Sequence, residues 1–144
     1  MSGVQANSNR FSSTATASGA YLVSHTAASN HAVKVFFNLD AQGSAGGPQV
    51  FFEVYTADSI SSGSPSSLTR SKVNKNDPET LQGTLQSYAG TPTPVSGELL
   101  DTIVLSAQGA GSTPVYTLRG GKVIYLKAKC ATDTACGVVV KTDE

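Results

Sequence analysis

The stretches VKVFFNLD (33–40) and PQVFFEVYT (48–56) decide the expected fold, because large apolar side chains alternate with other residues along both of them. Successive side chains of a β-strand point to opposite sides of a sheet, so this period of two predicts strands rather than helices. The expected core face consists of Val33, Val35, Phe37, Leu39, Val50, Phe52 and Val54. The segment AQGSAGG (41–47) predicts a flexible turn, and we therefore expect the two strands to form a hairpin.

The same kind of pattern continues towards the C-terminus, whereas residues 57–97 are the least regular part of the chain. The C-terminal part, residues 98–144, is predicted to contain four more strands: ELLDTIVLSA (98–107), STPVYTLR (112–119), KVIYLKAKC (122–130) and CGVVVK (136–141). Gly120-Gly121 suits a tight hairpin turn, because glycine takes up positive φ without steric cost. Such a hairpin sets Leu118 opposite Val123 and Tyr116 opposite Tyr125.

These signals together predict an all-β protein of about eight to ten short strands. The expected architecture is a two-sheet antiparallel sandwich or a jelly-roll-like barrel, with residues 21–144 as a single β domain. Residues 1–20 are small and polar and are expected to form an extended N-terminal arm. This arm is either disordered or ordered on a neighbouring subunit, and STATAS (13–18) within it is able to pair as an edge strand.

Charge and composition argue against two classes of partner. The ten basic and ten acidic residues give a net charge of zero, whereas a domain that binds nucleic acid through phosphates is usually basic. A polybasic membrane patch and an apolar run of about 20 residues are both absent from the sequence. We expect no nucleic acid and no membrane as partners, and synthesis in the cytoplasm, since residues 1–20 lack the apolar core of a signal peptide.

The residues that usually carry chemistry are sparse. Cys130 and Cys136 are expected to be reduced and buried in a chain made in the cytosol, although a short hairpin between them also allows a disulfide. His25 and His31 are expected in surface loops. Neither pair has the spacing of a known zinc site, and no G-x-S-x-G or phosphate-binding glycine motif occurs. We therefore expect no enzyme activity, no catalytic residue, no metal and no cofactor.

One feature favours binding to other proteins. The strand stretches 33–40, 48–56 and 122–130 carry large apolar residues on both faces, whereas a sandwich strand needs only one apolar face. The second face is covered either by a partner protein or by residues 57–97 of the same chain. The predicted protein-interface residues, including the aromatic residue of the arm, are Phe11, Phe36, Phe51, Tyr55, Tyr116 and Tyr125.

The stretches SSTATASGAYLVSHTA (12–27), HAVKVFFNLD (31–40) and TLRGGKVIYLKAKC (117–130) resemble virion structural proteins of tailed bacteriophages, in particular small capsid cement or decoration proteins. The resemblance lies in general style and in no residue-level motif. It implies a β-rich subunit that forms a dimer or trimer with itself, binds the major capsid protein and reinforces the shell on the capsid surface. The alternatives are a phage tail, fibre or baseplate component and a carbohydrate-binding β-sandwich module.

Overall fold

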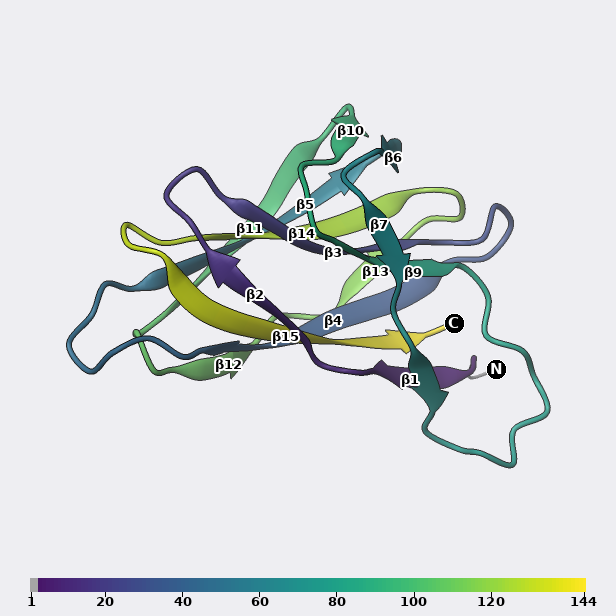
Figure 1. Cartoon of the computed structure of the whole chain (residues 1–144). Helices are drawn as coiled ribbons and strands as arrows, with labels where there is room; N and C mark the ends of the chain where they lie inside the picture. The colour runs from purple at the N-terminus through teal and green to yellow at the C-terminus, as the bar shows by residue number, and fades with distance from the viewer. Residues whose placement is uncertain (1–2) are drawn as a thin grey trace.

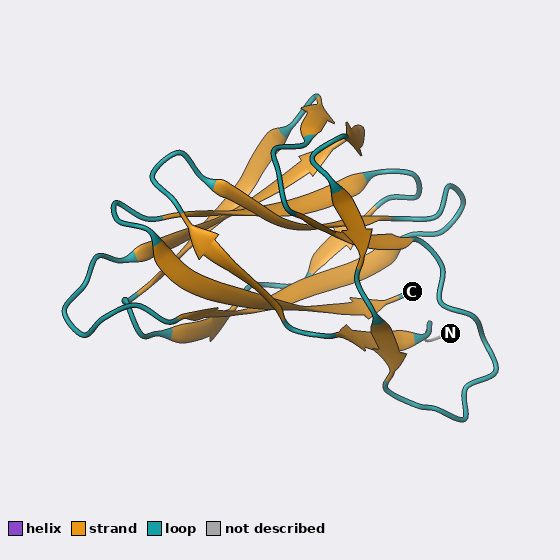
Figure 2. Ribbon diagram, viewed as in Figure 1, coloured by secondary structure: helices purple, strands orange, loops and turns teal. Residues whose placement is uncertain are grey.

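The computed structural model describes residues 3–144 and shows two antiparallel sheets packed face to face (Figure 1). This confirms the predicted all-β class and shows an antiparallel sandwich. Loops and turns join the strands throughout (Figure 2). Among residues 3–144, no helix is long and apolar enough to cross a bilayer.

Within residues 3–144 the fold has fifteen strands, and six of them span only three residues. In chain order they are β1 (Gln5–Ser8), β2 (Phe11–Ala15), β3 (Ala20–Thr26), β4 (Val33–Ala41), β5 (Val50–Ala57), β6 (Ser59–Ser61), β7 (Pro65–Ser67), β8 (Arg70–Lys72), β9 (Thr84–Tyr88), β10 (Thr93–Val95), β11 (Glu98–Leu105), β12 (Ala110–Ser112), β13 (Tyr116–Leu118), β14 (Val123–Lys129) and β15 (Thr134–Asp143).

The first layer is a seven-stranded sheet with β4 and β15 at its centre. These two strands pair from Cys136 opposite Ala41 to Asp143 opposite Lys34. Short strands extend the sheet on both sides: β12 and β13 pair with β4, β1 and β2 pair with β15, and β8 pairs with β1. The second layer is a six-stranded sheet in the order β11-β5-β14-β3-β9-β7, and β6 and β10 form a separate two-stranded ribbon.

The core fills the space between the two large sheets. All seven residues of the predicted core face are buried, as are the inward side chains Ile124 and Leu126 of β14. Complete burial of such an aliphatic or aromatic side chain stabilises a fold by about 1.5–3 kcal/mol relative to exposure. The alternation seen in the sequence therefore predicts correctly which side of each strand faces inward.

The predicted hairpin between β4 and β5 is wrong. β4 lies in the seven-stranded sheet and β5 in the six-stranded sheet, so the connection between them crosses from one layer to the other. Their apolar faces meet across the core instead of lying side by side in one sheet. Two strands in opposite layers satisfy the same alternation as two paired strands, because each needs only one buried face.

The predicted hairpin around Gly120-Gly121 is also wrong, although the turn itself forms. The N–H of Lys122 donates to the carbonyl of Arg119 at 3.1 Å, and Gly121 has a φ of 78°. The turn joins β13 in one sheet to β14 in the other. As a result, Tyr116 lies opposite Val35 of β4 instead of Tyr125.

The N-terminal segment differs from an extended arm. β1 and β2 both pair with β15 of the same chain, with Phe11 opposite Val138. The backbone N–H of Val4 also donates to the carbonyl of Glu144 at 2.7 Å. Residues 3–20 are thus part of the sandwich, STATAS pairs as expected through its first residues, and residues 1 and 2 of the expected arm lie outside the described part.

Candidate functional site

The outer face of the six-stranded sheet carries an apolar surface beside its edge strand. Phe51 of β5 lies opposite Val104 of β11, and Tyr55 lies opposite Leu99. The exposed fractions are 40% for Phe51, 46% for Val104 and 49% for Leu99. We call these three residues the β11 surface. It includes one predicted interface residue, Phe51, and two that the sequence analysis missed, although the apolar run of 98–107 signals them.

The strand β11 is itself open along one side. Its only partner among the described strands is β5, so the far edge of this eight-residue strand pairs with nothing in residues 3–144. Asp101 lies on this strand, where its Oδ1 accepts from the N–H of Thr102 at 2.8 Å and its Oδ2 accepts from the hydroxyl of Tyr116 at 3.0 Å. Burial and the Asp101 carboxylate raise the pKa of Tyr116 to about 12.

Next to the β11 surface, three tyrosines stack on the outer face of the same sheet. The ring centroid of Tyr125 lies 5.0 Å from that of Tyr55 and 5.8 Å from that of Tyr21. The Nζ of Lys127 lies 4.8 Å from the centroid of Tyr21, within the range of a cation–π contact. The segment after β10 covers Tyr125, since a Cβ atom at Gly97 would lie 2.6 Å from its hydroxyl oxygen.

This cover decides which aromatic residues are accessible. Tyr125 is only 3% exposed, and its burial raises the pKa of its hydroxyl to about 12. Tyr55 is half-buried and donates from its hydroxyl to Oε1 of Glu53 at 3.0 Å. Part of residues 57–97 therefore folds over this end of the face, which is the second of the two alternatives that the sequence left open. Phe51 remains uncovered.

The outer face of the seven-stranded sheet contains a groove of about 610 Å³. Phe36 lines this groove, is half-buried, and lies beside Lys141 of the paired strand β15. Val73, which follows β8, and Val115, which precedes β13, also line the groove and are 57% and 58% exposed. We call Phe36, Val73 and Val115 the Phe36 groove. The two valines were not predicted as interface residues: Val73 lies in the irregular part 57–97, and Val115 lies in the predicted strand 112–119 but was not assigned to an exposed face.

Phe11 and Tyr116, the remaining predicted interface residues, point towards the interior. Both are partly buried and pack against the main core. The six predicted residues thus separate into three groups. Phe36, Phe51 and Tyr55 lie on outer faces, Phe11 and Tyr116 lie at the rim of the core, and Tyr125 is buried.

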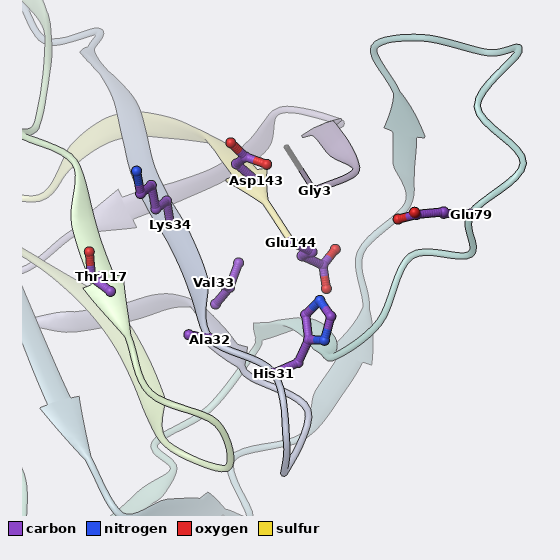
Figure 3. Close-up of a pocket in the computed structure, with 9 residues that line it drawn as sticks. All are labelled: Gly3, His31, Ala32, Val33, Lys34, Glu79, Thr117, Asp143 and Glu144. Carbon is purple, nitrogen blue, oxygen red and sulfur yellow. The ribbon is translucent and has the colours of Figure 1, made fainter. Parts of the chain in front are cut away.

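A second groove, of about 590 Å³, lies beside the chain ends (Figure 3). Figure 3 shows the carboxylate of Glu144 directed towards the ring of His31, with Glu79 further out. Glu144 is held by Arg70, whose Nη1 lies 2.6 Å from its Oε2. Burial raises the pKa of Glu144, and Arg70 opposes this shift. In the part of the chain that the structure describes, no three His, Cys, Asp or Glu side chains are grouped to hold a metal ion.

The expectation of two surface histidines is wrong for His25. This residue lies in β3, is completely buried, and has no hydrogen-bond partner at either ring nitrogen. Burial, assisted by the charge of Arg70, lowers its pKa to about 4. His31 is exposed in the loop after β3 as expected. The position of His25 was missed because a polar residue in a strand gives no signal that it faces the core.

Both cysteines are buried free thiols, so no disulfide joins them. β14 and β15 lie in different sheets, and the short hairpin that would bring Cys130 opposite Cys136 does not form. The Sγ of Cys130 lies 3.2 Å from Oγ1 of Thr134. Burial raises the pKa of Cys136 to about 11, which disfavours the reactive thiolate.

No protein family and no curated protein matches the chain. Among solved structures, one chain from "Structure of infectious bursal disease virus Gx strain" is similar at 15% sequence identity and a TM-score of 0.24. The match covers 94% of this chain and 39% of the viral one. A similarity at this level gives no argument about function.

Proposed function

We propose that this protein is a non-enzymatic virion structural protein, a cement or decoration subunit. It binds to the shell of major capsid proteins, associates with copies of itself, and resides on the capsid surface after synthesis in the host cytoplasm. The resemblance of stretches 12–27, 31–40 and 117–130 to phage virion proteins supports this proposal. The observation that carries it is the Phe36 groove, a partly apolar groove on the outer face of the seven-stranded sheet.

The groove has the features of a protein-binding surface. Val73 and Val115 expose more than half of their surface on opposite sides of Phe36. Burial of such side chains drives association, because removal of apolar surface from water contributes about 25 cal/mol per Å². Lys34 and Lys141 also line the groove, and Lys141 donates to Oδ1 of Asn7 at 3.3 Å. An apolar centre with polar surroundings is typical of protein interfaces.

The alternative functions receive less support. A tail, fibre or baseplate component would use the same kind of surface, so the groove does not distinguish it from a capsid subunit. A carbohydrate-binding module needs exposed aromatic rings for stacking on sugars. Tyr88 and Tyr125 are buried and the hydroxyl of Tyr116 is bound to Asp101, so these rings give that function no support.

Binding to empty shells tests the proposal. The shells are assembled from the major capsid protein of the genome that encodes this chain, and bound protein is measured by co-sedimentation over a range of concentrations. The double variant Val73→Ser/Val115→Ser is expected to bind at least about tenfold more weakly, since about 1.4 kcal/mol of binding free energy corresponds to a factor of ten. Both residues are exposed, so the variant keeps the fold.

The matched control is Val95→Ser, which changes an equally exposed valine of the two-stranded ribbon and leaves the groove intact. It is expected to bind like the unmodified protein. Equal binding of the double variant and the control would contradict a role for the groove, and absence of any binding to shells would contradict the proposed function.

A further inference from the structure

We propose that the open edge of β11 is a self-association site, where a second copy of this chain adds its own β11 in antiparallel pairing. The two six-stranded sheets then continue into one another across a two-fold axis. This inference deepens the proposed function, because self-association is part of it, but it is carried by different residues from those of the Phe36 groove.

β11 has eight residues, whereas the strands at the other sheet edges are shorter. At the opposite edge of the same sheet, β7 has three residues, begins with Pro65 and otherwise consists of serine. In the seven-stranded sheet, the outer strands β8, β12 and β13 have three residues each, the outer strand β2 has five, and β8 carries Arg70 and Lys72. Short length, proline and basic side chains are the usual devices that prevent edge-to-edge pairing.

β11 lacks these devices. Its eight residues, ELLDTIVL, include no proline, lysine or arginine. Its one charged side chain within the regular part, Asp101, accepts from the backbone N–H of Thr102 and from the hydroxyl of Tyr116. Pairing with a second copy has the N–H of Thr102 exchange the Asp101 carboxylate for a carbonyl of the added strand. A long apolar edge of this kind presents unpaired backbone groups that an extended strand satisfies by adding to the sheet.

The distribution of charge along β11 makes the strand complementary to a second copy of itself. Its acidic residues, Glu98 and Asp101, lie in the first half of the strand, and the second half is uncharged. A two-fold axis at Ile103 sets Asp101 opposite Leu105 and Thr102 opposite Val104. This register keeps the carboxylates of the two copies apart, and the zero net charge of the chain adds no long-range repulsion between them.

The orientation of the side chains agrees with this register. Thr102 and Val104 pair with Glu53 and Phe51, which lie on the outer face, whereas Leu105 is buried. Residues opposite each other in the proposed pair therefore face the same side of the joined sheet, as a regular ladder requires. The register of β11 shifts between Leu99 and Asp101, where a bulge ends the regular segment.

The joined sheet also covers exposed apolar surface. Val104 and Phe51 form a row that ends at the open edge, and pairing places the equivalent row of the second copy next to it. The contact is isologous, so it closes after two copies and does not lead to a filament. The β11 surface thereby gains the cover that residues 57–97 give to Tyr125 but not to Phe51.

The test is the molar mass of the full chain by light scattering and sedimentation equilibrium over a range of concentrations, with no shells present. We expect a reversible dimer. The variant Val104→Lys, which places an ammonium group beside the edge, should raise the dissociation constant at least tenfold. The control Val95→Lys changes a similarly exposed valine of the two-stranded ribbon, outside both the groove and the β11 surface, and should leave the dimer unchanged. Circular dichroism of each variant establishes that it is folded.

A strictly monomeric protein at the highest concentration would overturn the inference, as would a Val104→Lys variant that dimerises like the unmodified chain. If the protein is monomeric and Val104→Lys weakens binding to shells, the strand that adds to β11 comes from a different protein. If the self-association proposal fails, the proposed binding to shells is not affected, because the shell-binding experiment uses variants of Val73 and Val115. The double variant of these two residues is expected to dimerise normally.

Discussion

The two edges of the six-stranded sheet differ in how the chain treats them. The β7 edge is short and is followed by residues 68–83, which Arg70 ties to Glu144 and to the backbone carbonyls of Gln82 and Gly83. The β11 edge is long and carries exposed apolar residues along its outer face. Beyond β7 the chain passes into β8 of the other sheet and is held there by polar contacts, whereas the far side of β11 pairs with no other strand in residues 3–144.

The largest expected effect comes from Arg70→Met, which removes the ion pair with Glu144 and the hydrogen bonds to the carbonyls of Gln82 and Gly83. The Arg70–Glu144 pair is almost fully buried, with side-chain exposed fractions of 11% and 4%. Loss of one partner leaves the Glu144 carboxylate buried without its counter-charge and should lower the free energy of unfolding by about 3 kcal/mol. Urea unfolding measures this change.

The control for this variant is Lys122→Met, which breaks the exposed pair with Asp58 and should leave the free energy of unfolding unchanged. In Arg70→Met, hydrogen exchange should also become faster in residues 68–83 and stay the same in β11. Uniformly faster exchange over both edges would mean that Arg70 supports the whole sandwich and not one side of it.

A somewhat smaller effect is expected from acid, again on the β7 side. Folding lowers the pKa of His25 from 6.5 to about 4, so the unfolded chain binds a proton that the folded chain excludes. The free energy of unfolding is unaffected by this titration above the unfolded pKa of 6.5. It decreases as the pH falls from there towards the folded pKa of about 4. Between pH 7.5 and pH 5 the free energy of unfolding should decrease by roughly 2 kcal/mol through His25 alone.

The variant His25→Leu removes this titration and should show a flatter dependence on pH over the same range. Urea unfolding of both proteins at several pH values makes the comparison. Parallel pH profiles for the two proteins would show that His25 is not the residue responsible.

The smallest effect is expected from Tyr116→Phe, which acts on the β11 side. The substitution removes the hydrogen bond to Oδ2 of Asp101 and keeps the packing of the ring on the core. A half-buried hydrogen bond to a charged group is worth about 1–2 kcal/mol. Thermal unfolding should therefore show a small decrease in stability, and dimerisation should persist because the backbone edge of β11 and Val104 are unchanged. Complete loss of the dimer in this variant would mean that Tyr116 controls the edge.

Much of the candidate site follows from alternation along single strands. Phe36 and Phe51 were expected on outer faces because Val35, Phe37, Val50 and Phe52 already supply the inner ones, and the structure places both there. The same reasoning failed for Tyr125, which also faces outward but lies under the segment around Gly97. Alternation tells which side of a strand a residue occupies, but it does not tell what lies above that side.

The sequence by itself determined the all-β class, the inward and outward sides of the main strands, and the turn at Gly120-Gly121, because these depend on residues close in the chain. Tertiary structure alone decided the pairing. β4 and β5 were expected to be neighbours and lie in opposite sheets, and the expected arm became β1 and β2 of the seven-stranded sheet. The reason is physical: every strand here needs a buried face and a hydrogen-bonded neighbour, and many arrangements satisfy that local need, so long-range packing makes the choice.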